Sequence, residues 1–473
     1  MKTSLSFFLL LIGLLPAPVR ADAPSVPAGA ARIDITPEDP VQLINVKEPT
    51  ESERVGRKLF ARALAMGAGE KAVVLLGYDG IGVPATLAER VAGRITEEHG
   101  LPRDRIALCA SHTHWAPHLT DLLTGIYGGP LPEDHQKRVD AYTDLLADRL
   151  VAVAGEALAA RQPSRLAWTT GRVTFAANRR MEEGGRLLRD PDRQLMVTWN
   201  PEAPVDHTLP VLSVRDAATG DLTALHFTYA CHNVAITGSL ISGFENTIHG
   251  DWVGLTLEEI ERRHPGCVAI GTIGCGGDQR PDFCGDEGVA MAHAREIADE
   301  VDRLLGDDTW QTFGAPEAAT MDRTELPLEP MPSEETLREY VNHPIQTPPT
   351  AARAHVARNR LDQIEAGEET PDGVPFLSQS WRFADGGPTF VFMAGEVCID
   401  FQLRIRKEHG PGVWPVAYAN ATPCYIVSRR MVERGGYEAG NSMFYYGWLR
   451  PFQPEVEDLV MQSVARVLEG GAE

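Results

Sequence analysis

Two histidines, one residue apart, are the strongest local sign of chemistry in this sequence. His112 and His114 come at the end of an apolar segment, 105–111, that is typical of a buried strand. Because side chains alternate along a strand, positions i and i+2 face the same side, so the two imidazoles would point together. Neutral imidazole is a good zinc ligand, and strand ends open onto loops in which sites are built. The pair is equally compatible with a metal site and with an ordinary polar strand end.

Three further polar positions follow apolar segments elsewhere in the chain. His232 ends the apolar segment 222–231, although a lone histidine in such a place is more often structural. Glu396 follows the apolar segment 389–395. Burying its charge is costly without a cation or a donor, so we expect a metal or an arginine beside it. Tyr425 lies in a third segment of this kind, after the expected strand 413–420.

The segments that must position these residues alternate between strands and helices. Apolar runs predict strands, and amphipathic runs predict helices. The expected strands cover 31–37, 71–79, 105–111, 166–176, 209–215, 222–231, 267–273, 377–384, 389–394 and 413–420, and the expected helices cover 84–98, 134–162, 252–264, 399–408 and 454–469. This alternation indicates the α/β class, with layered mixed β-sheets flanked by helices. The polar, proline-broken region 332–368 is expected to form a small helical insertion.

Composition and absent motifs exclude several classes of function. The formal net charge is −22, and the acidic residues are scattered, which disfavours nucleic acid and anionic membrane surfaces as partners. The glycine-rich stretch 274–281 lacks the GK[ST] ending of a phosphate loop. The sequence also contains neither GxSxG nor HExxH, so the commonest serine hydrolases and zinc proteases are excluded.

The first 23 residues have the features of a secretory signal peptide. Lys2 precedes an apolar run, 5–15, and small residues follow at 21–23. The run is much shorter than the roughly 20 apolar residues of a membrane-spanning helix. We therefore expect cleavage after residue 23, a secreted or periplasmic protein without a transmembrane segment, and a single domain over 24–473.

The seven cysteines are too few and too irregularly spaced for a disulfide framework. In an oxidising compartment, Cys275 and Cys284 could close a short loop. Cys231, Cys398 and Cys424 each lie within two residues of a candidate ligand. We expect these three to pack as small buried hydrophobic residues.

Nine motifs, taken in order, resemble the neutral or alkaline non-lysosomal ceramidase family. They are ARIDITP, SHTHWAP, FAANRR, FTYACHNVAI, HGDWVG, GGDQRPD, FMAGEV, YANATPCYIVS and YEAGNSMFYYG, and they extend from residue 31 to about 448. Each motif is weak by itself, but nine in the same order are strong evidence of a common fold and weaker evidence of a common substrate. The resemblance implies the fold of the ceramidase catalytic domain.

The resemblance also implies a zinc site and a set of substrate contacts. The positions that match the family's zinc ligands are His112, His232, Glu396 and Tyr425. His114 matches a histidine that faces the substrate beside the metal, and Arg179 matches a donor to the substrate carbonyl or its oxyanion. Tyr437 matches a tyrosine near the substrate, and Asp278 is expected to orient a ligand or the water. The residues by themselves leave open which of the two paired histidines binds the metal.

Two departures indicate a divergent member of that family. Arg280 stands where the family has an active-site serine, and the sequence contains no match to the family's C-terminal immunoglobulin-like domain. A guanidinium in the pocket favours a carboxylate or phosphate on the substrate, such as an N-acyl amino acid. Alternatively, Arg280 faces solvent or pairs with Asp278 or Asp282.

We therefore expect an exported zinc-dependent hydrolase that cleaves the amide bond of a small or lipid-like N-acyl compound with metal-activated water. Two alternatives remain. The first is a zinc-dependent hydrolase or lyase of another exported substrate, such as an ester or a carbohydrate derivative. The second is a secreted binding protein that has the same fold without catalysis. The oligomeric state is left open.

Overall fold

The computed structural model describes residues 24–44, 49–181, 184–190, 195–237, 244–345 and 347–470. At its centre is a nine-stranded sheet made of β1 (Val26–Asp34), β5 (Phe60–Met66), β6 (Val73–Tyr78), β7 (Ile106–Ala110), β8 (Gln162–Arg172), β12 (Thr208–Asp216), β13 (Leu222–Tyr229), β15 (Val268–Ile273) and β18 (Gln311–Phe313). The order across the sheet is β15-β13-β12-β8-β1-β5-β6-β7, and β18 pairs with β8. The pairs β6–β7 and β13–β15 are parallel, so the sheet is mixed.

A second, four-stranded sheet packs against one face of the first. Its strands, in spatial order, are β19 (Pro316–Pro327), β20 (Gly373–Phe383), β21 (Thr389–Met393) and β23 (Val413–Val416). Large aromatic side chains of this sheet, among them Trp381, Phe392 and Trp414, form one buried cluster with Leu75 and Leu212 of the large sheet. The two sheets therefore share a hydrophobic core.

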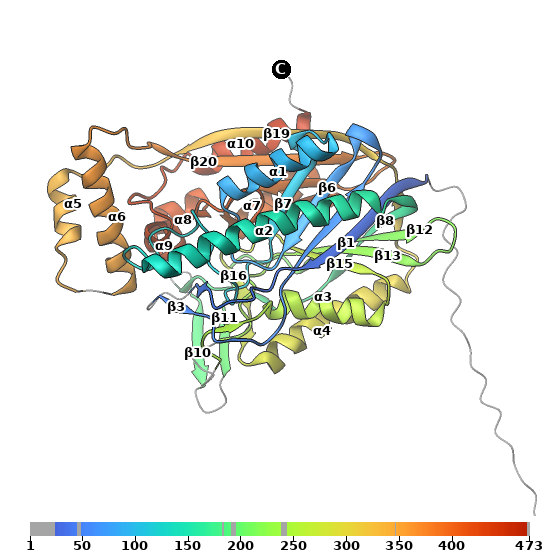
Figure 1. The fold of residues 1–473 in the computed structure, drawn as a ribbon, viewed down its shortest axis with the longest axis horizontal. Coiled ribbons are helices and arrows are strands. Elements are labelled where there is room, and N and C mark those ends of the chain that lie inside the picture. The colour runs from blue at the N-terminus through green and yellow to red at the C-terminus, as the bar shows by residue number, and fades with distance from the viewer. Residues whose placement is uncertain are drawn as a thin grey trace, which may run out of the picture.

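Helices cover the two outer faces of this pair of sheets (Figure 1). Four of them lie on the large sheet, namely α1 (Ala85–His99), α2 (Glu133–Ala159), α3 (Asp251–Arg263) and α4 (Glu287–Leu305), and α10 (Val456–Glu469) lies on the small sheet. In α1, the residues Leu87, Val91 and Ile95 recur every fourth position and are buried, as an amphipathic helix requires. The predicted α/β class with layered mixed sheets is confirmed.

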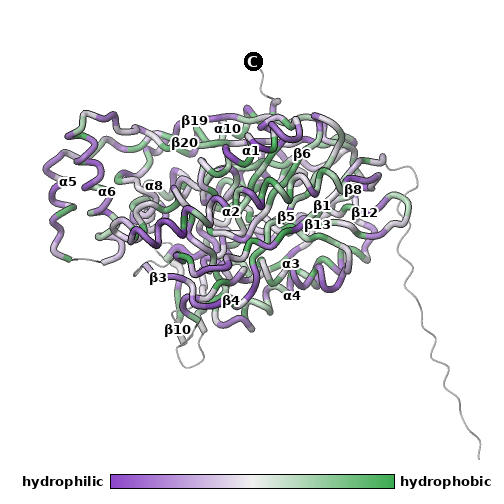
Figure 2. The backbone as a smooth tube through the Cα atoms, in the orientation of Figure 1, coloured by the Kyte–Doolittle hydropathy of each residue, from purple (hydrophilic) through white to green (hydrophobic). Residues whose placement is uncertain are grey.

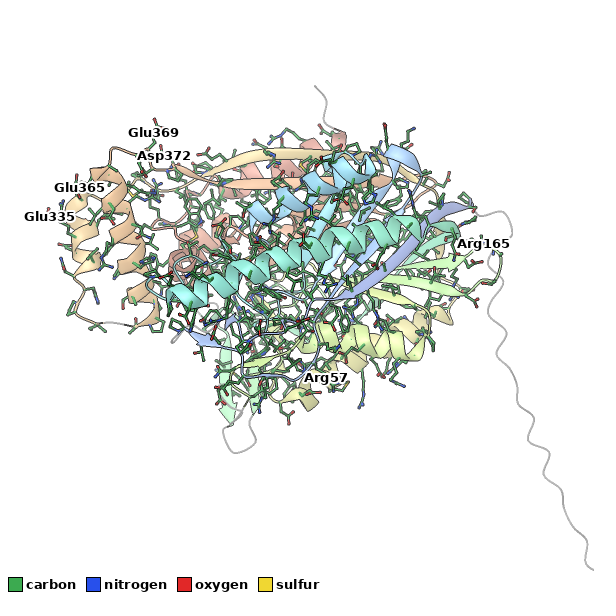
Figure 3. The ribbon with its side chains drawn as sticks, in the orientation of Figure 1. Arg57, Arg165, Glu335, Glu365, Glu369 and Asp372 are labelled. Carbon is green, nitrogen blue, oxygen red and sulfur yellow. The ribbon has the colours of Figure 1, made fainter. Side chains whose placement is uncertain are left out.

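The hydrophobic residues gather in the central strands, as the hydropathy colouring shows (Figure 2). One helical pair, α5 (Glu334–Val341) and α6 (Pro348–Glu365), projects from the end of the molecule, within the predicted insertion 332–368. Acidic side chains, including Glu335 and Glu365, lie on this projecting pair (Figure 3). The division into domains stays a prediction.

Among the elements that were not predicted from the sequence are strand β5, helix α4 and strand β19. Strand β5 reads Phe-Ala-Arg-Ala-Leu-Ala-Met and is buried almost throughout, so the alternation that marks a strand is missing. Helix α4 and strand β19 also lie in segments to which no element was assigned. The predicted signal peptide, 1–23, lies outside the described residues. Within the described part of the chain, no helix combines the length and the apolar character needed to cross a bilayer.

The predicted Cys275–Cys284 disulfide is wrong. All seven cysteines are free and buried. The Sγ atom of Cys284 instead contacts the Arg280 guanidinium, at 3.2 Å from Nη2, and the Cys275 amide bonds to Gln402. Cys231, Cys398 and Cys424 are fully buried in the main hydrophobic cluster, as predicted.

Candidate metal centre

The candidate site forms where strands of both sheets end. His112 comes two residues after β7, and His232 comes three residues after β13. Glu396 and Tyr425 begin the two short parallel strands β22 (Glu396–Val397) and β24 (Tyr425–Ile426), in which they are directly paired. Four side chains that are far apart in the sequence therefore meet at one point.

The distances between these side chains are those of donors around a single ion. The Nε2 atoms of His112 and His232 lie 3.2 and 3.1 Å from Oε2 of Glu396. Nε2 of His232 lies 3.2 Å from the Tyr425 hydroxyl. Nitrogen and oxygen ligands bind tetrahedral zinc at about 2.0–2.1 Å, which places neighbouring donors about 3.3 Å apart. The donor set and its spacing fit zinc.

Backbone carbonyls orient both imidazoles. Nδ1 of His112 is 2.5 Å from the Ile81 carbonyl oxygen, and Nδ1 of His232 is 2.6 Å from that of Gly276. Because a carbonyl can only accept, each Nδ1 carries the proton and each Nε2 turns a lone pair toward the cluster. Burial also lowers the pKa of His232 to about 3, which keeps the ring neutral as a ligand must be.

His114 offers an alternative third nitrogen. Its Nε2 lies 3.3 Å from Nε2 of His112, and the ligand atoms of His112, His114 and His232 all lie within 4.8 Å of one another. Glu396 lies 3.2 and 3.1 Å from the two buried histidines, so the cluster offers two donor sets, one with His114 and one with the carboxylate. The assignment of the ligands stays a prediction.

The paired histidines meet, but not through the predicted strand alternation. Strand β7 ends at Ala110, before either histidine, and His112 has a left-handed backbone with φ +60°. The rings of His112 and His114 still lie edge to face, with centroids 4.9 Å apart. A left-handed conformation is unfavourable for a residue other than glycine and persists only where its surroundings determine it, as the Ile81 contact does here.

Arg179 connects the cluster to its outer edge. Its Nη2 donates to the Tyr425 hydroxyl at 3.0 Å, and its Nε donates to Oε1 of Glu438 at 3.0 Å. The guanidinium also lies over the Tyr437 ring, 5.7 Å from its centroid. Tyr437 is 44% exposed, so this side of the cluster reaches the protein surface. The structure thus brings Arg179 and Tyr437 to the site.

Asp278 lies behind the cluster. Its carboxylate accepts from the Asn178 side chain at 2.8 Å and from the Ile399 amide at 2.9 Å, and burial raises its pKa to about 6. It thereby ties the start of helix α7 (Ile399–His409) to the loop whose Gly276 carbonyl holds His232. This position fits the predicted supporting role, which stays a prediction.

Arg280 is not brought to the histidines by any contact recorded among the described residues. It belongs to the short strand β16 (Gln279–Pro281), its Nη2 contacts Cys284, and its buried Nε has no hydrogen-bond partner in the described part of the chain. Within the described ranges it forms an ion pair with neither Asp278 nor Asp282, and its side chain is partly exposed. Its role in reading substrate charge stays a prediction.

Three functional positions were missed from the sequence. Tyr418 donates to Oε2 of Glu396 at 3.3 Å, and Tyr446 donates to Oε1 of the same carboxylate. Glu438 holds Arg179 and Arg180, each at 3.0 Å. All three lie inside motifs that the sequence had already marked. The requirement that each oxygen of a buried carboxylate finds a partner could have drawn attention to the two tyrosines.

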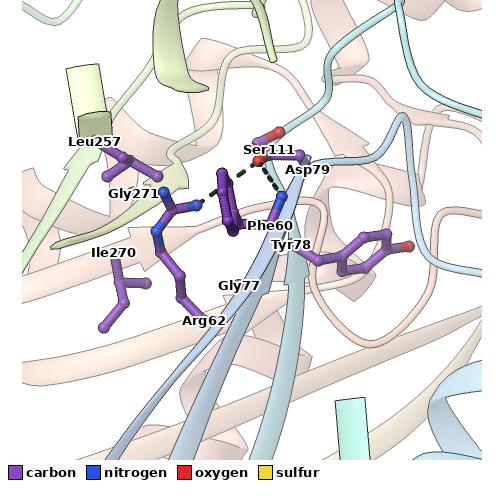
Figure 4. Close-up of a pocket in the computed structure, with 9 residues that line it drawn as sticks. All are labelled: Phe60, Arg62, Gly77, Tyr78, Asp79, Ser111, Leu257, Ile270 and Gly271. Atoms are coloured by element: carbon purple, nitrogen blue, oxygen red, sulfur yellow. Dashed lines mark hydrogen bonds and ion pairs between the residues drawn. The ribbon is translucent and has the colours of Figure 1, made fainter. Parts of the chain in front are cut away.

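A buried ion-pair network anchors the loop next to His112 (Figure 4). Arg62, 2% exposed, lies 3.7 Å from Asp79 and 3.1 Å from Glu261, and Asp79 also accepts from the Phe60 amide at 2.9 Å. Asp79 begins the loop that carries the Ile81 carbonyl. The network therefore supports the orientation of the His112 ring indirectly, through the loop that carries Ile81.

Neither a family model nor a curated protein sequence matches this chain. Among solved structures, neutral ceramidase from Pseudomonas aeruginosa matches with a TM-score of 0.68 and 17% identity, over 96% of this chain and 76% of that chain. A structure described as ceramidase complexed with C2 matches with a TM-score of 0.67, at the same identity and coverage. The chain therefore has a neutral ceramidase-like fold, as the motifs predicted.

Proposed function

We propose that this protein is a zinc-dependent hydrolase that cleaves the amide bond of an N-acyl compound. The observation that carries the proposal is the convergence of the His112 and His232 Nε2 atoms on Oε2 of Glu396, at 3.2 and 3.1 Å. The proposed ligands are these three residues and Tyr425. Zinc, when bound, polarises a carbonyl and lowers the pKa of a water from about 15.7 to about 7. The likeness to neutral ceramidases supports an amide as the bond that is cleaved.

The side chains around the centre supply the remaining steps. Arg179 donates to the substrate carbonyl oxygen as negative charge develops on it, and the Tyr437 hydroxyl is the second donor. Nε2 of His114 accepts the proton that the attacking water loses and returns it to the leaving nitrogen. Burial, as the largest cause, lowers the pKa of His114 well below its usual range, so the ring is neutral at neutral pH and one of its nitrogens carries a free lone pair. Asp278 holds the His232 loop in place.

The proposed substrate is a small or lipid-like N-acyl compound that carries a negative charge, such as an N-acyl amino acid. Arg280 supports this choice, because its buried Nε has no partner among the described residues. We further propose that residues 1–23 are a cleaved signal peptide and that residues 24–473 form one catalytic domain, secreted or periplasmic. Export would give the enzyme access to substrates outside the cytoplasm.

The test is product analysis of the zinc-loaded protein by mass spectrometry. The panel contains ceramide, N-acyl amino acids, esters of the same acyl chain and glycans. We expect free fatty acid and free amine from the amides, and a stoichiometric zinc content that is lost in His112→Ala and kept in the exposed control His409→Ala. Turnover of esters or glycans without amides would indicate the other hydrolase class. A protein that binds no stoichiometric zinc would indicate a binding protein.

Arg280→Ala extends the same assay. If Arg280 binds the acidic group of the substrate, the variant loses kcat/KM on N-acyl amino acids by about 10-fold or more, as for a charge-assisted hydrogen bond, and keeps its rate on uncharged ceramide. Equal losses on both substrates would exclude a role in reading charge.

A further inference from the structure

The two oxygens of Glu396 have different surroundings. Oε2 faces His112, His232 and the Tyr418 hydroxyl, at 3.2, 3.1 and 3.3 Å. Oε1 accepts the hydroxyl proton of Tyr446. A carboxylate with both oxygens free can bind a metal through one oxygen or through both, so the partner of Oε1 decides between the two modes.

The position of Tyr446 is fixed by two contacts of its own. Its backbone follows helix α9 (Ser442–Tyr445), and its amide donates to the Met443 carbonyl at 3.1 Å. Its ring lies edge-on to that of Tyr425, with centroids 6.3 Å apart. The hydroxyl is therefore held from two sides, by the helix end and by the neighbouring aromatic ring, at the carboxylate.

We propose that Tyr446 is a positioning residue for the metal centre, which rests on the proposed zinc function. Its hydroxyl holds Oε1, so Glu396 presents Oε2 alone to the metal. With one Glu396 oxygen, the two histidines and the Tyr425 hydroxyl, the residues would supply four donors to a zinc ion and leave a fifth position free, whereas a chelating carboxylate would fill it. In hydrolytic zinc sites, such a free position takes water or substrate.

The same short segment also holds the substrate side of the site. The turn of π-helix at Tyr437–Asn441 precedes α9 and carries Glu438, which binds Arg179. One stretch of chain, 437–446, thus places Tyr437, the partner of Arg179 and the partner of Glu396. The segment 437–446 therefore positions both the Glu396 carboxylate and the proposed substrate donors.

The test compares Tyr446→Phe with Tyr445→Phe, using Zn²⁺ and Co²⁺ as probes and no substrate. Tyr445 is adjacent and buried, and its hydroxyl has no hydrogen bond among the described residues. Removing the partner of a metal ligand lowers metal affinity by about 10–100-fold. We expect a loss of this size in Tyr446→Phe, measured by competition with a chromophoric chelator.

We also expect a changed visible spectrum of bound Co²⁺, which reports the number of ligands. The control should match the wild type in both.

Three outcomes would overturn the proposal. If Tyr446→Phe binds Zn²⁺ as the wild type does and Co²⁺ gives the same spectrum, the Tyr446 hydroxyl does not determine how Glu396 binds the metal. If Tyr445→Phe shows the same losses, the effect belongs to the packing of this segment. In both cases the proposed zinc function stands. If the wild-type protein binds neither Zn²⁺ nor Co²⁺, both the Tyr446 proposal and the proposed zinc function are wrong. Because the assay measures metal binding without substrate, this outcome differs from a protein that binds zinc and does not cleave amides.

Discussion

At the scale of single residues, Arg179 is held by a carboxylate that the motifs did not single out. Glu438 is 3% exposed and binds both Arg179 and the fully buried Arg180. Hydrogen bonds to charged groups contribute about 1.5–3 kcal/mol, so the position of Arg179 depends on this contact.

Glu438→Gln should therefore lower amide hydrolysis. We expect kcat/KM to fall about 10–100-fold, corresponding to the loss of one charge-assisted hydrogen bond. The fall should lie mainly in kcat, because Arg179 is proposed to donate where charge develops. Zinc content, measured by mass spectrometry, should be unchanged. The exposed Glu433→Gln is the matched control, and a loss of similar size in that variant would argue against a specific role.

At the scale of elements, a buried aspartate joins the loop after His232 to the start of α3. Asp251 has φ +52° and is fully buried. Its carboxylate accepts from the amides of Ala235, Ile236 and Trp252, at 3.0, 3.1 and 2.6 Å. Burial nevertheless raises the pKa of Asp251 to about 7. The ionised carboxylate is therefore less stable in the folded protein than in the unfolded chain.

This raised pKa predicts a pH dependence of stability. Between about pH 4 and pH 7 the folded state holds the proton of Asp251 while the unfolded state has lost it, so stability falls as pH rises. The slope from this residue is at most about 1.4 kcal/mol per pH unit. Asp251→Asn should remove that contribution, measured as the difference from the wild type in urea unfolding at pH 5 and pH 7. The exposed Asp221→Asn should keep the wild-type slope, and parallel slopes in all three proteins would contradict the prediction.

At the scale of the whole molecule, the candidate centre joins the two sheets. His112 and His232 follow strands of the nine-stranded sheet, whereas Glu396 and Tyr425 follow β21 and β23 of the four-stranded sheet. An ion held by all four would link the layers at the edge of their shared core. Its binding should therefore contribute to the stability of the complete fold.

Metal removal should accordingly lower the thermal midpoint of unfolding. A ligand that binds only the folded state stabilises it by about 2.7 kcal/mol when its concentration is 100 times the dissociation constant. Differential scanning calorimetry with excess zinc and with a chelator measures the effect. His232→Ala should show the same midpoint under both conditions. A wild-type midpoint that does not respond to the chelator would speak against a metal shared by both sheets.

Periodic apolar patterns and strand-end polar residues are local properties, so the sequence by itself determined the fold class, most strands of the two main sheets, and the residues worth testing as ligands. Strand β5 was missed because it is buried on both faces and lacks alternation. The Cys275–Cys284 pair was wrong because sequence proximity does not report side-chain direction. The order of the nine motifs also predicted the ceramidase-like fold, because proteins that share a fold carry their matching segments in the same order along the chain.

Only the tertiary structure decided how the site is assembled. The parallel pairing of Glu396 with Tyr425, the Ile81 carbonyl that orients His112, and the Tyr446 hydroxyl on Glu396 all join segments that are not neighbours in sequence. Arg280 turns toward Cys284 for the same kind of reason. Local composition names the groups that could do chemistry. Which atoms face one another depends on long-range packing, because the direction of a side chain is set by contacts from distant parts of the chain.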